Sequence, residues 1–283
     1  MTVITEDSAF AILEHLLGIL RDASNRHHRR YQAVLKNLLV DHELFTYLRP
    51  QVYEMFGHGK IPNWDQLKQF GGDINAEDRG VYLHIIRGTD GKDRLYVGQS
   101  TNMAVRIKKN HLNFRYRRDH KSFHYFAVED STWDTFVILA TIPSPLKALS
   151  HGHDNASVAL LLNVLEMWCA LMLRTLQPAQ AEQYLPPGEA VEESTWFPLN
   201  VASPIDHGDS TVQRMWSDTL IDSRDKLAVF YHISHVSSKY EDRYGANTGC
   251  FQEQSYRGTF LAGIIVGLSF GYFLATKFDR RYR

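Results

Sequence analysis

The sequence predicts an α+β protein in which a small mixed or antiparallel sheet is flanked by helices. Three observations support this fold class. Apolar residues recur at three- and four-residue steps over residues 7–57, which indicates amphipathic helices. They alternate with other residues on both sides of a glycine-containing turn over residues 80–100, which indicates a strand pair. Residues 157–177 form a long apolar helical pattern that ends at Pro178.

These patterns divide the chain into five predicted parts. They are a helical N-terminal region (1–75), a sheet-containing domain (76–185), an irregular connecting region (186–256), an apolar segment that resembles a transmembrane helix (257–277) and a short basic tail (278–283). The polar run at residues 25–30 is interpreted as a solvated turn between two N-terminal helices, with phosphate contact as the alternative.

Within the sheet-containing domain, the turn at residues 88–91 has the glycines and the aspartate that hairpins require. The spacing predicts a helix over residues 101–113 after the return strand. Further strands are expected at 123–128 and 136–141, and one more in the connecting region at 227–232.

Composition limits the classes of function. The 283 residues carry a formal net charge of -1, so any surface for a polyanion must be local. Cys169 and Cys250 are far apart and belong to no CxxC pair. This argues against a disulfide framework and a cysteine zinc site, and it fits a reducing compartment.

The predicted hairpin brings together residues that suit phosphate chemistry. Tyr82 and Tyr96 lie on its two strands, and Arg106 follows ten residues after Tyr96. A guanidinium can bind two phosphoryl oxygens in a planar fork, and its charge favours ionisation of a nearby phenol. We therefore expect these three side chains to form one site.

Glu166 is a candidate metal ligand for that site. It is the only acidic residue between Ala156 and Gln180, in the long apolar helix. A carboxylate directed at the hairpin could hold Mg²⁺, or Mn²⁺, beside a phosphate. The alternative is that Glu166 lies on the one exposed stripe of an otherwise buried helix.

In this order, the residues resemble the GIY-YIG nuclease family. The tripeptide GVY, which contains Gly80 and Tyr82, corresponds to the first signature, and YVG, from Tyr96 to Gly98, corresponds to the second. Arg106 matches the helical arginine of the family and Glu166 its metal-binding glutamate, and the resemblance covers residues 79–180.

The resemblance implies a metal-dependent endonuclease that hydrolyses phosphodiester bonds. In this assignment Tyr82 activates or orients water, Tyr96 assists through a hydrogen bond, Arg106 stabilises phosphoryl charge and Glu166 holds the metal. The two motif glycines, Gly80 and Gly98, are structural.

Two departures from the family pattern keep other functions open. Some members carry a histidine four residues after the arginine, where this chain has Asn110. His111 follows one position later, and one helical step of about 100° could turn it away from the site, so it is a possible auxiliary residue. A terminal asparagine is also missing, and Gln180 is a weak substitute. The alternatives are a binding module that has lost catalysis and a membrane-anchored interaction protein.

A cluster of positive charges between residues 106 and 124 favours a nucleic-acid partner, most readily DNA, with RNA as an alternative. Aromatic residues are interleaved with the cations, as a surface that binds phosphates and stacks bases requires. The alternatives are a solvated surface and a patch that faces anionic lipid. The predicted contact residues are Lys108, Lys109, Arg115, Arg117, Arg118 and Lys121.

Residues 259–276 contain no charged side chain, which indicates a membrane span, although a span typically has about 20 apolar residues. Gly263, Gly267 and Gly271 line one helix face and could support helix–helix association. The alternative is a buried helix of a globular domain. We expect an intracellular protein tethered by a C-terminal anchor, on an organelle surface, and glycosylation of Asn155 would contradict this topology.

Overall fold

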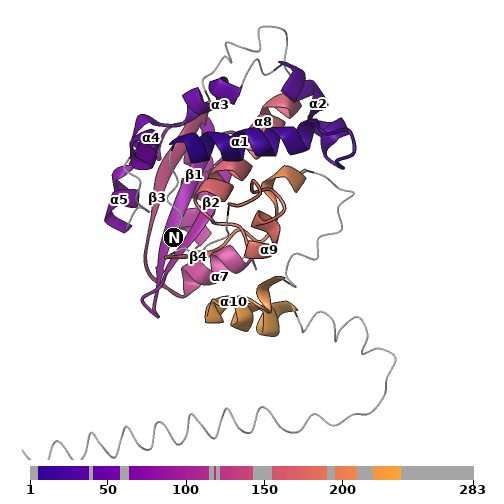
Figure 1. Ribbon diagram of the computed structural model, residues 1–283. Helices are drawn as coiled ribbons and strands as arrows, with labels where there is room; N and C mark the ends of the chain where they lie inside the picture. Colours follow the sequence, from indigo (N-terminus) through magenta and orange to yellow (C-terminus); the bar gives the residue numbers. More distant parts are fainter. Residues whose placement is uncertain are drawn as a thin grey trace, which may run out of the picture. The chain divides into compact units, whose positions relative to one another are not determined.

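The protein is described by a computed structural model that covers residues 6–37, 41–57, 64–114, 118, 122–142, 155–189, 195–208 and 219–236 (Figure 1). All of these residues belong to one compact unit, which spans Met1–Ser237. The unit combines a four-stranded mixed sheet with helices, which confirms the predicted α+β class.

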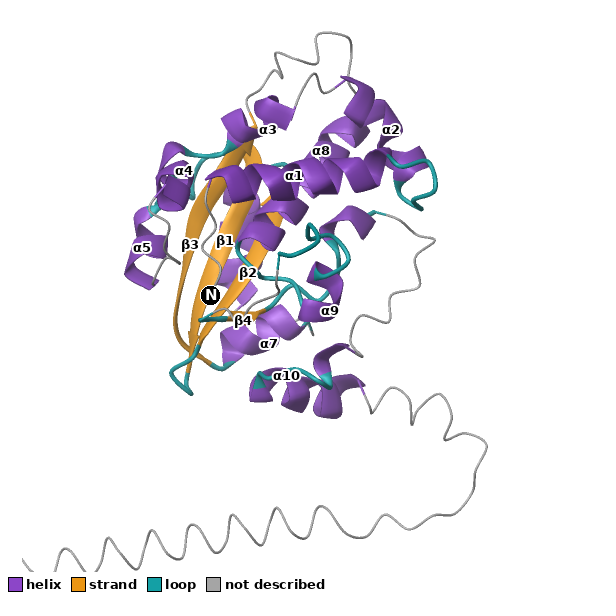
Figure 2. Ribbon diagram, viewed as in Figure 1, coloured by secondary structure: helices purple, strands orange, loops and turns teal. Residues whose placement is uncertain are grey.

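The sheet has the strand order β3-β1-β2-β4 (Figure 2). Strand β1 is antiparallel to both of its neighbours, β2 and β3, and the short β4 pairs in parallel with the start of β2. The bounds are Arg79–Gly88 for β1, Asp93–Ser100 for β2, Ser131–Ile142 for β3 and Phe197–Pro198 for β4. The predicted hairpin is therefore present as β1 and β2, and Gly91 takes a φ of +73° in its turn, where glycine avoids a steric penalty.

The helices surround this sheet in chain order. They are α1 (Glu6–Arg21), α2 (His28–Asn37), α3 (Asp41–Tyr47), α4 (Pro50–Gly57), α5 (Trp64–Gln69), η1 (Val105–Leu112), α7 (Phe123–Glu129), α8 (Asn155–Met172), α9 (Pro178–Ala181), η2 (Pro204–Asp206), α10 (Lys226–Tyr231) and η4 (His232–Val236). The last predicted turns of the 157–177 helix are absent because Arg174 adopts a left-handed φ of +50°.

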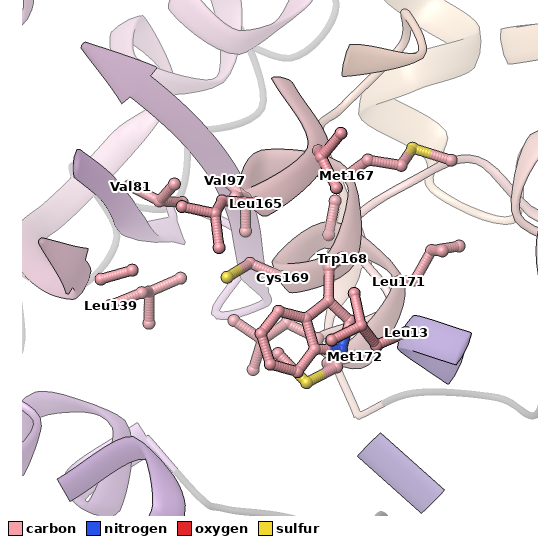
Figure 3. Close-up of a cluster of buried hydrophobic side chains, with 14 of the residues drawn as sticks. Leu13, Val81, Val97, Leu139, Leu165, Met167, Trp168, Cys169, Leu171 and Met172 are labelled. Atoms are coloured by element: carbon pink, nitrogen blue, oxygen red, sulfur yellow. The ribbon is translucent and has the colours of Figure 1, made fainter. Parts of the chain in front are cut away.

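One face of the sheet packs on α8, which in turn packs on α1 (Figure 1). Alternate residues of β1, among them Val81 and Leu83, enter this layer with Val97 of β2 and Leu165 of α8 (Figure 3). The indole N–H of Trp168 donates to the Ala9 carbonyl oxygen at 3.0 Å and links α8 to α1. This layer fixes α8, and therefore Glu166, relative to the hairpin.

The opposite face of the sheet is covered by other elements. Tyr82 of β1 packs with Met103 and Ile107, which precede and belong to η1. Ile86, further along β1, packs against α7. Because β1 is central and buried on both faces, successive side chains of this strand enter two different layers.

Two predicted strands are wrong. Residues 123–128 form α7 and residues 227–232 belong to α10 and η4. A short apolar run is compatible with a helix or with a strand, and the flanking residues determine which of the two forms. Asp225 begins α10 as an N-cap, since its carboxylate accepts a hydrogen bond from the Leu227 amide at 3.1 Å.

The predicted membrane anchor, residues 259–276, and its three glycines lie outside the described residues. Within the part of the chain that the structure describes, no helix is both long and apolar enough to cross a bilayer.

We predict that Asp225→Ala lowers the free energy of unfolding by about 1–3 kcal/mol, because it removes one of the two carboxylates bonded to the buried Arg94 guanidinium and leaves only the more exposed Asp90. Asp225 receives hydrogen bonds from Arg94 at 2.7 Å, and neither side chain is more than 1% exposed. Urea denaturation would measure the loss. The exposed Asp222→Ala is the matched control, and equal stability of the two variants would contradict this role.

Candidate active site at the end of strand β2

The two tyrosines of the hairpin lie on the same face of the sheet. In the register of β1 and β2, Tyr82 is opposite Gly98 and His84 is opposite Tyr96. Directly opposed residues of antiparallel strands share a face, so both phenols point to the side that η1 covers. Their ring centroids are 6.4 Å apart.

At Gly80 and Gly98, the glycines of the two tripeptides, neighbouring atoms lie too close to the backbone to leave room for a side chain. A Cβ on Gly98 would lie 2.5 Å from the Tyr82 hydroxyl oxygen and 2.8 Å from a ring carbon of Tyr96. A Cβ on Gly80 would lie 2.2 Å from the Ala140 carbonyl oxygen. The phenol of Tyr82 therefore extends over Gly98, toward the β2 side of the hairpin.

Arg106 and His111 converge on the Tyr82 hydroxyl. The Arg106 Nε–H donates to that oxygen at 3.3 Å, and His111 Nε2 lies 2.6 Å from it. Tyr82 and His111 are both buried, whereas Arg106 is part-exposed. Solvent therefore reaches this group through the arginine.

The helical step does not turn His111 away from Tyr82, because η1 is a π-helix. Its hydrogen bonds join residues five positions apart, so residues with that spacing lie on one face. Arg106 and His111 have this spacing. The wider turn thus compensates for the one extra residue, and π-helical turns are frequent at functional sites.

Glu166 approaches the same end of β2 from the opposite layer. Asn163, one turn earlier on α8, accepts a hydrogen bond from the Gln99 side chain, next to Gly98. Residues three apart share a helix face, so Glu166 lies beside this contact. Glu166 is 1% exposed, and neither of its carboxylate oxygens has a hydrogen-bond partner.

The electrostatics join these side chains into one site. Burial raises the pKa of Tyr82 well above its usual range, the neighbouring Tyr96 adds to the rise, and Arg106 opposes it. Burial also raises the pKa of Tyr96, with the Glu166 charge as the next contribution. Both phenols are therefore protonated at neutral pH.

A buried carboxylate without a hydrogen bond is costly unless a cation is near. Within the described residues no group of three or more His, Cys, Asp or Glu side chains forms a metal cage. The Nδ1 of His207 lies 3.3 Å from Oε2 of Glu166. If a divalent cation binds on this side of the sheet, Glu166 is the carboxylate that could hold it.

The structure also contains a chain of polar side chains next to Tyr96 that the sequence did not predict as part of the site. His84 Nδ1 lies 2.8 Å from His124 Nε2, and His84 Nε2 lies 2.9 Å from the Asp134 carboxylate. The His124 ring stacks on Tyr96 with centroids 4.0 Å apart. The sequence feature that could have indicated His84 is its position two residues after Tyr82, which places both side chains on the same face of the strand. His124 had none, because its segment was predicted to be a strand.

The remaining predicted residues have mixed outcomes. Lys108 and Lys109 are exposed on η1, next to Arg106, and Arg118 is also exposed. Gln180 is buried, and its amide donates to the Val201 carbonyl oxygen, so it anchors the segment after β4. The other three predicted contact residues, Arg115, Arg117 and Lys121, lie outside the described residues.

Comparison of the chain with protein-family models, with curated proteins and with solved structures finds no match.

We predict that Gly98→Ala lowers the free energy of unfolding by about 1–3 kcal/mol, because the added methyl overlaps the Tyr82 phenol. Thermal and urea denaturation would measure this. The control is Gly18→Ala in α1, where a Cβ meets nothing within 4 Å and Ala should stabilise the helix by up to about 1 kcal/mol. A Gly98→Ala protein as stable as the wild type would contradict the packing.

The raised pKa values of Tyr82 and Tyr96 predict a loss of stability in alkali. Unfolded phenols release protons near pH 10, whereas these two keep theirs in the folded state. The unfolded state then binds fewer protons, so stability falls as pH rises above about 10 and is unaffected below it. Tyr82→Phe should make this fall less steep. Phenolate absorbance that rises equally in folded and urea-unfolded protein would contradict the assignment.

Proposed function

We propose that this protein is a metal-dependent endonuclease of the GIY-YIG type that hydrolyses phosphodiester bonds, most readily in DNA. The observation that carries the proposal is the convergence of His111 and Arg106 on the Tyr82 hydroxyl, at 2.6 Å and 3.3 Å. The buried, unbonded carboxylate of Glu166 at the same end of β2 supports it.

The contact between Tyr82 and His111 supports a route for the proton of the attacking water. A phenol with a raised pKa is a poor base alone. If Tyr82 passes its own proton to His111 Nε2, its oxygen can accept a proton from water at the same time. Imidazole is a suitable acceptor near neutral pH. The water oxygen then bonds to phosphorus, and the leaving oxygen departs and is protonated by solvent.

Arg106 is suited to bind the phosphate during this step. Its Nε–H is used by Tyr82, and the other N–H groups of the guanidinium can donate to the non-bridging oxygens. Preorganised donors of this kind stabilise the charge that develops in the transition state. Tyr96, which is part-exposed, can donate a hydrogen bond from the same face.

Glu166 would hold the divalent cation, Mg²⁺ or Mn²⁺, which supplies Lewis-acid stabilisation of the phosphate and the leaving oxygen when bound. The exposed Lys108 and Lys109 would extend the binding surface along the nucleic-acid backbone.

The test is cleavage of plasmid, branched and single-stranded DNA by the full-length protein, with Mg²⁺ or Mn²⁺. We expect Glu166→Gln to lower the cleavage rate at least about 100-fold through loss of metal binding. His111→Ala should lower it by about 100- to 10,000-fold. The matched control is Glu14→Gln, since Glu14 is exposed on α1 and should leave the rate unchanged.

Cleavage by Glu166→Gln at the wild-type rate would contradict the proposal. DNA binding that weakens with salt, without metal-dependent nicking of any substrate, would instead favour the catalytically inactive binding module. The absence of both would favour an interaction protein.

A further inference from the structure

His207 faces the proposed metal ligand from a part of the chain that has no place in the predicted site. Its Nδ1 lies 3.3 Å from the Glu166 Oε2, yet this carboxylate accepts no hydrogen bond. The imidazole is 34% exposed, whereas Glu166 is 1% exposed. The histidine thus stands between the buried carboxylate and solvent.

Many hydrogen bonds fix the segment that carries His207. The Tyr31 hydroxyl donates to the Ile205 carbonyl oxygen at 2.8 Å, and Arg30 donates to the carbonyl oxygens of Ile205 and His207. The Asn163 side-chain amide also donates to the His207 carbonyl oxygen, at 3.2 Å. Because Asn163 precedes Glu166 by one turn of α8, this bond sets His207 directly against the carboxylate.

The neighbouring Asp206 strengthens this anchoring. It is fully buried, accepts two hydrogen bonds from Arg26 at 3.0 Å and 3.2 Å, and lies 3.5 Å from His27 Nε2. The run at residues 25–30, interpreted from the sequence as a solvated turn, therefore holds the His207 segment in place. The hydrogen bonds from Arg30 and Asn163 are accepted by the backbone oxygen of His207.

We propose that His207 is a second protein ligand of the cation at Glu166, and that the site therefore selects a first-row transition-metal ion over Mg²⁺. This inference rests on the proposed metal-dependent function. Two ligand atoms about 2.1 Å from one ion lie about 3.0–3.4 Å apart at right-angled to tetrahedral geometry. The separation of 3.3 Å between Nδ1 and Oε2 is within this range.

The donor types determine the metal preference. Mg²⁺ takes oxygen ligands and keeps several waters, whereas imidazole nitrogen suits transition metals. One carboxylate and one imidazole would fill two coordination positions of such an ion. Glu166 would then supply charge, and His207 would supply selectivity.

The test is direct metal binding by the full-length protein, without substrate. Titration with Co²⁺ would be followed by its visible absorption, and Mg²⁺ binding by calorimetry. We expect His207→Ala to weaken Co²⁺ binding at least about tenfold and Mg²⁺ binding less than about threefold. His207→Asp, which replaces nitrogen by oxygen, should shift the preference back toward Mg²⁺.

The controls separate this inference from the proposed nuclease function. His15→Ala, on α1, should bind Co²⁺ like the wild type, and circular dichroism would verify that each variant is folded. Loss of Co²⁺ binding in Glu166→Gln with unchanged or tighter binding in His207→Ala would overturn the inference and leave the nuclease proposal standing. Equal binding by Glu166→Gln and the wild type would overturn both. Metal binding as expected without DNA cleavage would support His207 and contradict the nuclease.

Discussion

The site depends on the central position of β1, which is buried on both faces of the sheet. Pairing with β2 and β3 leaves neither edge of the strand free, so alternate side chains must enter two different layers. Val81 and Leu83 enter the layer of α8, while Tyr82 enters the layer of η1. A shift of one residue in register would exchange these layers and bury the phenol among aliphatic side chains.

The second constraint is space at Gly98. The Tyr82 ring crosses the β2 backbone there, and a Cβ would overlap its hydroxyl. This close crossing carries the hydroxyl to the end of β2 that α8 reaches from the other layer, where Asn163 bonds to Gln99. The sheet therefore lies between the Tyr82 layer on one face and the α8 layer, which carries Glu166, on the other. Burial explains why the phenols have raised pKa values.

Much of the fold followed from local patterns. The alternation of apolar with other residues predicted β1 and β2, and apolar residues at three- and four-residue steps predicted α1 and α8. The two wrong strands were short apolar runs, where propensity is ambiguous and an N-cap such as Asp225 decides. Of the candidate site, the pair of tyrosines and Arg106 could be predicted, because a hairpin fixes which residues are opposite each other. His124 and His207 could not, because their contacts join distant segments.

The sequence by itself determined the hairpin, its two glycines and the set of residue types that suit phosphate chemistry. Only the tertiary structure decided the role of His111, since one extra residue is out of phase in an α-helix but in phase in the π-helix that the chain forms. It alone also brought His207 to Glu166, through hydrogen bonds that side chains of α2 and α8 donate to the His207 backbone oxygen. Sequence patterns report the periodicity of one element, whereas these contacts depend on packing between elements far apart in the chain.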